Sequence, residues 1–174
     1  MKIGILSDTH SKTTLAKKTI RHLIDEGAEF IIHAGDVCER KTLDELAECG
    51  KRYIAVYGNN DANLTKYHNI YNLVQEPHYF KLADIKFKLM HLPFYMSPDC
   101  DVLIFGHTHE FECEYKNSTL FLNPGETCAR NKNISESAML EVLEEDFRVT
   151  YYTRNIKNDK LNSKNFTFKR GRDG

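Results

Sequence analysis

The chain of 174 residues has no long apolar run and almost no net charge. A membrane span needs roughly 20 apolar residues, and a secretion signal needs a longer apolar segment than residues 1–6 provide. We therefore expect no membrane segment and a cytoplasmic protein. The 24 Lys and Arg residues against 25 Asp and Glu residues give a formal charge of -1. The positive excess that drives nonspecific nucleic-acid binding is missing.

The cysteines are few and lack a metal-binding or disulfide pattern. Their number is odd, and none of them forms a Cys-x-x-Cys pair. This spacing argues against a disulfide framework and against a thiolate zinc site. We expect reduced side chains that mostly pack in the interior. The five are Cys38, Cys49, Cys100, Cys113 and Cys128.

The first third of the chain alternates short apolar runs with segments of helical periodicity. Residues 3–6, 30–32 and 53–56 are apolar and typical of buried strands. Residues 11–27 and 39–49 have apolar side chains at helical spacing, follow polar residues able to cap a helix, and end at a glycine. The pattern predicts a β-α-β-α-β unit with parallel strands and right-handed crossovers.

Beyond residue 62 the apolar segments become shorter and lie closer together. Turn residues separate several of them, which indicates hairpins. We expect a second, largely antiparallel sheet packed on the first with helices outside, and hence an α/β fold that is a four-layer α/β/β/α sandwich of two mixed sheets. The expected strands are 79–82, 86–90, 102–105, 113–115, 120–122, 138–143 and 149–152.

The length predicts one domain, residues 1–154. Residues 155–174 are rich in Asn, Lys and Arg without a sustained period, and they predict a polar, flexible tail.

Side chains that bind metals follow five of the predicted strands. In open α/β sheets the carboxyl ends of strands meet at one edge, so residues distant in sequence converge there. Alternation in extended segments would point residues 8 and 10, and residues 107 and 109, to the same side. Glycines at 35, 58 and 106 would let the backbone turn and come close to an ion or phosphate. The side chains are Asp8, His10, Asp36, Asn59, His91, His107 and His109.

The mixture of carboxylate, imidazole and amide groups indicates which ions would bind. Mn, Fe, Ni and Zn accept such ligands, and a site without thiolates is not a structural zinc site. Seven ligands exceed one tetrahedral site. Two ions about 3.5 to 4 Å apart that share one carboxylate would use all of them, and such a dinuclear site suits phosphate-ester hydrolysis.

The motif series resembles that of the calcineurin-like metallophosphoesterases, in particular their small prokaryotic phosphodiesterase branch. The resemblance covers about residues 1–152. It rests on Asp8-x-His10, Gly35-Asp36, Gly58-Asn59-x-Asp61, His91, Gly106-His107-x-His109 and the turn Asn123-Pro124-Gly125.

The resemblance implies two divalent ions, with manganese favoured over nickel, iron or zinc, and a bridging hydroxide as nucleophile. It implies a catalytic role for Asp36, Asn59, Asn60 and His107. It assigns Asp8, His10 and His109 to the first ion, Asn59, His91 and His107 to the second, and Asp36 to both.

Two departures from the family pattern bear on the chemistry. Asn60 stands where many members have a histidine that faces the leaving group, so a protonating histidine is missing. Its amide either orients a phosphate oxygen or only lines the pocket. His91 precedes Leu92-Pro93 instead of glycine, and only 15 residues separate it from His107. The loop over the site must be short.

We expect supporting roles for four further residues near the predicted ligands. We interpret His33 as structural, and Asp61 as a residue that orients a histidine or holds its loop. Thr108 and Glu126 are candidates for positions near the substrate.

Three functions are compatible with these observations. The leading hypothesis is hydrolysis of a small phosphodiester. One alternative is a phosphomonoesterase or protein phosphatase, which the compact chain and the missing histidine disfavour. The other is a noncatalytic protein-binding scaffold, because the family includes a retromer subunit that uses this fold to bind partners. The site of that subunit is degraded, whereas all seven ligands are present here. Small members of the branch form dimers or tetramers, and the apolar segment Phe94-Tyr95-Met96 is a candidate interface.

Overall fold

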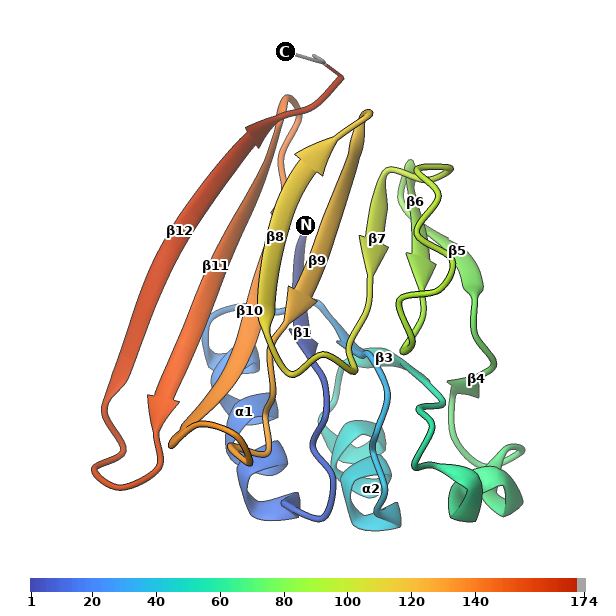
Figure 1. Ribbon diagram of the computed structural model, residues 1–174, viewed down its shortest axis with the longest axis vertical. Coiled ribbons are helices and arrows are strands. Elements are labelled where there is room, and N and C mark those ends of the chain that lie inside the picture. Colours follow the sequence, from blue (N-terminus) through green and yellow to red (C-terminus); the bar gives the residue numbers. More distant parts are fainter. Residues whose placement is uncertain (172–174) are drawn as a thin grey trace.

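The apolar runs of the sequence form two β-sheets that pack face to face in the computed structural model (Figure 1). The structure describes residues 1–171. The larger sheet has the strand order β12-β11-β10-β1-β2-β3-β4 and the smaller one the order β5-β6-β7-β9-β8. The strands are β1 (Lys2–Leu6), β2 (Phe30–His33), β3 (Arg52–Val56), β4 (Leu73–Val74), β5 (His78–Leu82), β6 (Ile85–Leu89), β7 (Val102–Ile104), β8 (Phe111–Lys116), β9 (Thr119–Pro124), β10 (Ile134–Val142), β11 (Asp146–Asn155) and β12 (Leu161–Lys169).

The predicted β-α-β-α-β unit is confirmed. Strands β1, β2 and β3 are parallel neighbours, joined by the helices α1 (Thr13–Asp25) and α2 (Arg40–Glu48). Gly27 and Gly50 follow the helices with φ of +97° and +77°, a left-handed conformation that ends a helix readily. The side-chain caps expected at the N-termini of the two helices are not formed, since no side chain makes a hydrogen bond at either N-cap.

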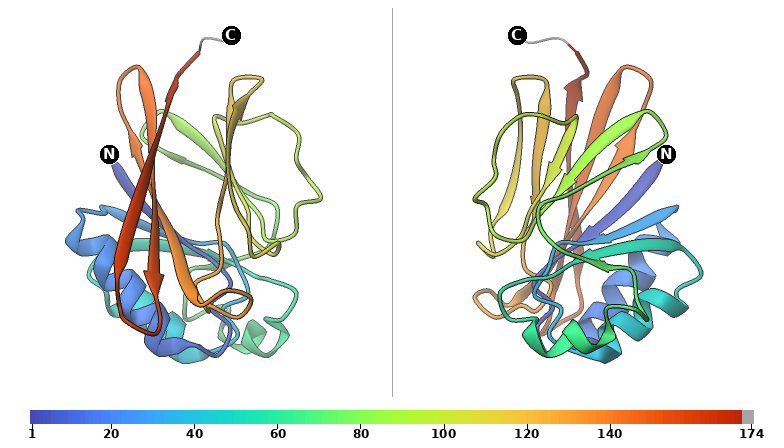
Figure 2. Two further views of the ribbon diagram at one scale, coloured as in Figure 1. Left: turned by 60° about the vertical axis from the view of Figure 1, so that its left-hand side comes forward. Right: turned by 90° about the vertical axis from the view of Figure 1, so that its right-hand side faces the viewer.

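The two outer faces of the sandwich are covered differently. Both helices pack on the outer face of the larger sheet (Figure 2). The described residues contain only one further helix, the short 3-10 helix η1 (Ala62–Tyr67), and none lies on the outer face of the smaller sheet. There Met96 and Cys100, from the loop before β7, pack against Leu103 and Phe121. The expected fourth, helical layer is therefore wrong, while the two mixed sheets are confirmed.

Strands β10 and β11 belong to the larger sheet, not to the second sheet as expected. β10 pairs antiparallel with β1 on the side away from β2, and β11 pairs with β10. The smaller sheet is also less antiparallel than predicted, since β6, β7 and β9 are parallel neighbours. The pairing of β1 with β10 joins segments far apart in sequence, so local periodicity does not reveal it.

The prediction of an irregular tail is wrong for residues 161–169, which form β12 beside β11. Phe166 and Phe168 alternate with polar residues and face the core, opposite Val149 and Phe147 of β11. The Phe166 ring also lies 5.5 Å from that of Phe111. Only three apolar residues occur in this strand, and one of them, Leu161, is exposed, so its period is hard to recognise. Residues 172–174 of the predicted tail lie outside the described residues.

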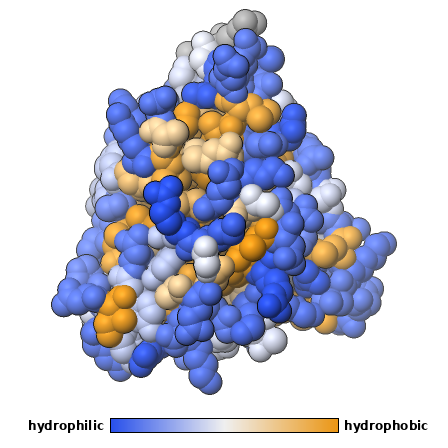
Figure 3. Space-filling model, turned by 180° about the vertical axis from the view of Figure 1, so that it is seen from behind, coloured by the Kyte–Doolittle hydropathy of each residue, from blue (hydrophilic) through white to orange (hydrophobic). Residues whose placement is uncertain are grey.

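The surface is largely hydrophilic. Seen from behind, apolar patches interrupt it, mainly in the upper half of that face (Figure 3). Within the expected interface segment, Phe94 and Tyr95 are 74% and 52% exposed, whereas Met96 is partly buried. Among the described residues, no helix is both long enough and apolar enough to cross a membrane.

Candidate metal centre

The seven predicted ligand side chains come together at one end of the two sheets. They lie on the loops that follow β1, β2, β3, β6 and β7, as the positions of the strands predict. Two clusters of potential ligand atoms lie there, one of His10, His109 and Cys128 and one of Asp8, Asp36 and His91. For the description below we group the side chains as the resemblance assigns them, with Asp36 near both His10 and His91. The convergence follows from parallel strands, whose carboxyl ends share an edge.

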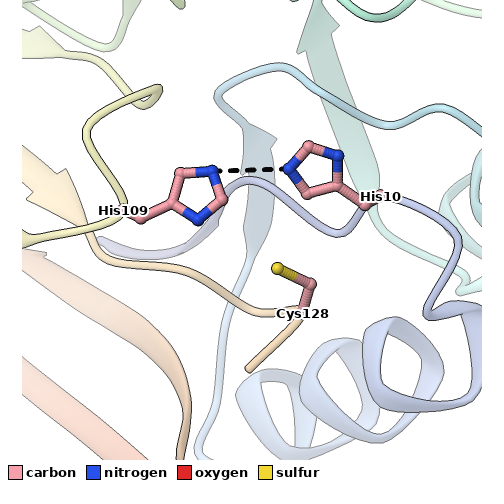
Figure 4. A group of neighbouring side chains, drawn as sticks. All are labelled: His10, His109 and Cys128. Carbon is pink, nitrogen blue, oxygen red and sulfur yellow. Dashed lines mark hydrogen bonds between the residues drawn. The ribbon is translucent and has the colours of Figure 1, made fainter. Parts of the chain in front are cut away.

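The first group contains Asp8, His10 and His109. The Nε2 atoms of His10 and His109 are 3.4 Å apart, and His109 Nε2 lies 3.3 Å from Asp8 Oδ1. Figure 4 shows the two rings, from the loops after β1 and β7, with these nitrogens facing each other. The three side chains are buried, so their polar atoms have little access to bulk water.

The second group centres on Asn59. Its Oδ1 lies 3.0 Å from His91 Nε2 and 3.1 Å from His107 Nδ1. His91 is fully buried, and its other ring nitrogen, Nδ1, is 2.8 Å from the backbone oxygen of Ala34. Nδ1 therefore carries the proton, and Nε2 is left free to act as a ligand.

Asp36 lies between the groups. Its Oδ2 is 3.7 Å from His10 Nε2, and its Oδ1 is 3.4 Å from His91 Nε2. Burial alone would raise the pKa of Asp36, but His91 and the hydrogen bonds from Asn60 hold it below its usual range. The pKa of His91 is raised in return, because its interaction with Asp36 outweighs the opposite effect of burial. Asp36 is therefore ionised and faces both groups.

The ligand loops are not extended, which corrects the alternation argument. Asp8 and His10 have φ of +52° and +44°, and His107 and His109 have φ of +69° and +61°. For residues other than glycine this left-handed conformation costs roughly 1–2 kcal/mol each. Backbone hydrogen bonds hold it in place, including Asp8 N to Gly35 O at 2.9 Å and His10 N to Asp36 O at 3.0 Å.

Two of the motif glycines allow close approach of the loops. A Cβ at Gly58 would overlap the backbone nitrogen and the carboxylate of Asp36. A Cβ at Gly106 would lie 2.9 Å from Asp8 Oδ2 and still closer to the hydroxyl of Ser7. The glycines therefore make room for neighbouring ligand loops, whereas the sequence predicted room for an ion or a phosphate.

His33 and Asp61 hold the loops, as expected. The Gly35 N–H donates to His33 Nδ1 at 3.2 Å, so Nε2 carries the proton and donates to the Thr9 hydroxyl at 3.0 Å. Burial lowers the pKa of His33 to about 3. Asp61 accepts the N–H groups of Val37, Cys38 and Gly58, which lie beside Asp36 and Asn59.

Glu126 is buried behind His109, on the side of the ring away from Asp8. Its buried Oε2 is 2.5 Å from His109 Nδ1, and its Oε1 accepts the N–H groups of Asn131 and Lys132. The adjacent Asp8 carboxylate, followed by Cys128 and Glu126, raises the pKa of His109 to about 11. Glu126 thus fixes the imidazole with Nε2 toward Asp8.

Thr108 is exposed between His107 and His109, and its hydroxyl is hydrogen-bonded to Asn123 and Glu112.

Sequence reasoning missed three residues that support the centre. The Ser7 hydroxyl donates to Asp8 Oδ2 at 2.6 Å, and the Glu76 carboxylate accepts the His91 N–H at 2.6 Å. Cys128 places its sulfur beside His10 and His109. Ser7 directly precedes the Asp8-x-His10 motif, so its role could have been inferred from the sequence. Nothing in the sequence around Glu76 or Cys128 indicates theirs.

Comparison with known proteins identifies the family. The model of the calcineurin-like phosphoesterase superfamily domain matches residues 1–145. The chain belongs to this family. A phosphodiesterase from Methanocaldococcus jannaschii is 32% identical over 161 residues, which cover 85% of this chain and 97% of that protein. This relative fits the small prokaryotic branch of the family.

Solved structures share the fold. An archaeal phosphodiesterase has a TM-score of 0.73 at 27% identity, covering 95% of this chain and 100% of its own. Vps29 from Entamoeba histolytica, in a single-mutant form, has a TM-score of 0.77 at 20% identity, covering 97% and 99%. The family and the phosphodiesterase relative support a phosphoesterase function for this chain.

Proposed function

We propose that the chain is a phosphodiesterase that works with two divalent ions, for which we expect manganese, with nickel, iron or zinc as alternatives. The position of Asp36 carries the proposal. Its two oxygens face different ligand groups, at 3.7 Å from His10 Nε2 and 3.4 Å from His91 Nε2. One carboxylate that serves two ions would have this placement.

The surroundings of Asp8 fit a cation. Its Oδ2 accepts hydrogen bonds from the Ser7 hydroxyl and the His107 N–H, whereas its Oδ1 accepts none from the described residues. A buried carboxylate oxygen without a partner is unfavourable, and a divalent cation would satisfy it. The first ion would be held by Asp8, His10 and His109, the second by Asn59, His91 and His107, and Asp36 would be shared.

When bound, the ions supply an activated water molecule and neutralise charge on the phosphoryl oxygens. The side chains of the protein fix the geometry for this chemistry. Ala34 O and Glu126 each contact Nδ1 of one histidine, His91 and His109, so that Nε2 of each faces the centre. Such outer contacts set the tautomer and the direction of an imidazole ligand.

Asn60 favours diesters with good leaving groups. Its backbone N–H and its amide both donate to Asp36, at 3.0 and 2.7 Å. An amide cannot protonate the departing oxygen, and general acid catalysis is worth about 10² to 10⁴ in rate. A monoester dianion also carries one more negative charge than a diester, so Asp8 and Asp36 repel it more strongly. The M. jannaschii relative, a phosphodiesterase, supports the same preference.

Metal content tests the dinuclear centre. We expect two ions per wild-type chain and a large loss from both positions in Asp36→Ala, because this residue serves both. Asp84→Ala is the matched control, since Asp84 is exposed on the β5–β6 turn, at the end of β6 opposite His91. Retention of nearly two ions by Asp36→Ala would contradict the shared carboxylate.

Hydrolysis of an aryl phosphodiester and the matching aryl monoester tests the substrate class. We expect faster hydrolysis of the diester. Faster hydrolysis of the monoester would instead identify a monoesterase. A protein that binds neither metal nor substrate would agree with the scaffold reading.

The variant Asn60→His tests the role of position 60 with metal occupancy matched. It should raise the rate for an alkyl phosphodiester more than for an aryl one, because only the alkyl leaving group needs a proton. An unchanged ratio of the two rates would show that residue 60 does not face the leaving group.

A further inference from the structure

Cys128 lies beside the first ligand group. Its sulfur and one ring nitrogen each of His10 and His109 all lie within 4.8 Å of one another, and all three residues are buried. Cys128 follows β9, and its side chain points toward the two rings (Figure 4). Its backbone N–H donates to Asp8 O at 3.1 Å, which ties it to the loop that carries two of the ligands.

Asp8 gives independent evidence that a cation belongs among these groups. The residue is fully buried, its Oδ1 has no hydrogen-bond partner within residues 1–171, and this atom lies 3.3 Å from His109 Nε2. The sulfur of Cys128 interacts with the His109 ring, and its hydrogen bond to Glu126 Oε2 is long, at 3.7 Å. It is therefore available to a metal ion.

The second nearby cysteine has a different geometry. Cys38 Sγ is 3.5 Å from His10 Nδ1, whereas His10 Nε2 is the nitrogen that faces His109 and Asp36. Cys38 therefore contacts the imidazole on the side away from the centre.

We propose that Cys128 is a sulfur ligand of the first ion, beside Asp8, His10 and His109. The inference rests on the proposed dinuclear centre and deepens it. As the sulfur–metal bond forms, the thiol loses its proton to solvent. Thiolates favour zinc and iron over manganese. The first site should therefore select a thiophilic ion, while the second, built from Asn59, His91 and His107, has only oxygen and nitrogen ligands.

Cobalt(II) absorption tests the sulfur ligand without any measurement of activity. Wild type, Cys128→Ser and Cys38→Ser are stripped with chelator, loaded with cobalt(II) and compared for cobalt content and for the near-ultraviolet sulfur-to-cobalt charge-transfer band. We expect the band in wild type and in Cys38→Ser, and its loss in Cys128→Ser. Circular dichroism checks that each variant is folded, and Cys128→Ala replaces the serine variant if that one does not fold.

The outcomes separate this inference from the proposed function. Wild type that binds two cobalt ions without the band, or a Cys128→Ser protein that keeps it, overturns the sulfur ligand alone. Wild type that binds no cobalt overturns the metal centre as well. As a second measure, Cys128→Ser should weaken zinc binding by roughly 10- to 100-fold and manganese binding much less. Equal weakening of both would contradict a soft ligand.

Discussion

Replacement of His33 by asparagine should make the fold less sensitive to acid. His33 is fully buried, accepts the Gly35 N–H at Nδ1 and donates from Nε2 to Thr9. A proton added at Nδ1 would face the Gly35 N–H and break this bond. Burial is the main reason that the pKa of His33 falls to about 3. The folded protein therefore keeps this side chain neutral.

The sign and size of the effect follow from linkage. Because the folded pKa lies below the unfolded value of about 6.5, the unfolded chain binds the proton first. The full stability is present above pH 6.5 and is lost as the pH falls toward 3. At pH 5 the gap from 6.5 is 1.5 units, which corresponds to about 2 kcal/mol. Near pH 3 the loss approaches about 5 kcal/mol.

Urea unfolding between pH 8 and pH 5, in the presence of chelator, measures this effect. His33→Asn keeps an oxygen that can accept the Gly35 N–H but has no titrating group. It should be less stable than wild type at pH 8, because it leaves a cavity and loses the bond to Thr9. The difference in unfolding free energy between wild type and His33→Asn should be smaller by about 2 kcal/mol at pH 5 than at pH 8. The other histidines are common to both proteins, so a gap that stays constant with pH would refute the reasoning.

Three further predictions concern the loops and the last strand. Gly58→Ala should lose most bound metal, since its Cβ would overlap Asp36, whereas Gly50→Ala, with open space around it, should cost only about 1 kcal/mol and keep the metal; metal analysis and urea melts distinguish the two. Glu126→Gln should weaken metal binding by roughly 10- to 100-fold, because His109 loses its charged partner; titration calorimetry with manganese that shows no change would contradict this. A chain truncated before β12 should lose at least about 3 kcal/mol of stability, because two phenylalanines leave the core; an unchanged urea midpoint would show that β12 does not support the sheet.

The convergence of the seven side chains was predictable because its signals are local. Each ligand follows an apolar run directly, and parallel strands bring such positions to one edge. The spacing of His91 and His107 also indicated a short loop, and the same 15 residues, which include β7, leave little room for the helical layer that we expected. We expected that layer because α/β folds commonly carry helices outside their sheets, and not because of residues in this segment.

The parts that were not predictable depend on distant contacts. β10 lies beside β1 although about 130 residues separate their starting residues, Ile134 and Lys2, and no local pattern marks such a pairing. β12 is polar except for Phe166, Phe168 and the exposed Leu161, so its apolar face is apparent only when β11 lies next to it. Cys128 has no spacing partner in sequence, and its proximity to His10 exists only in three dimensions.

The left-handed backbone at the ligand positions has a consequence for descent within the family. Asp8, His10 and Asp36 lie in loops outside the strands and helices. Their positive φ angles are strained, and surrounding contacts must offset this cost. A lineage that no longer needs the chemistry could exchange them for glycine or asparagine and relieve strain, while the two sheets keep their core. The architecture can thus persist after its chemistry is lost. Enzymes and non-enzymes with this fold should therefore be distinguished by their loop residues, because the two sheets stay the same whether or not the activity is kept.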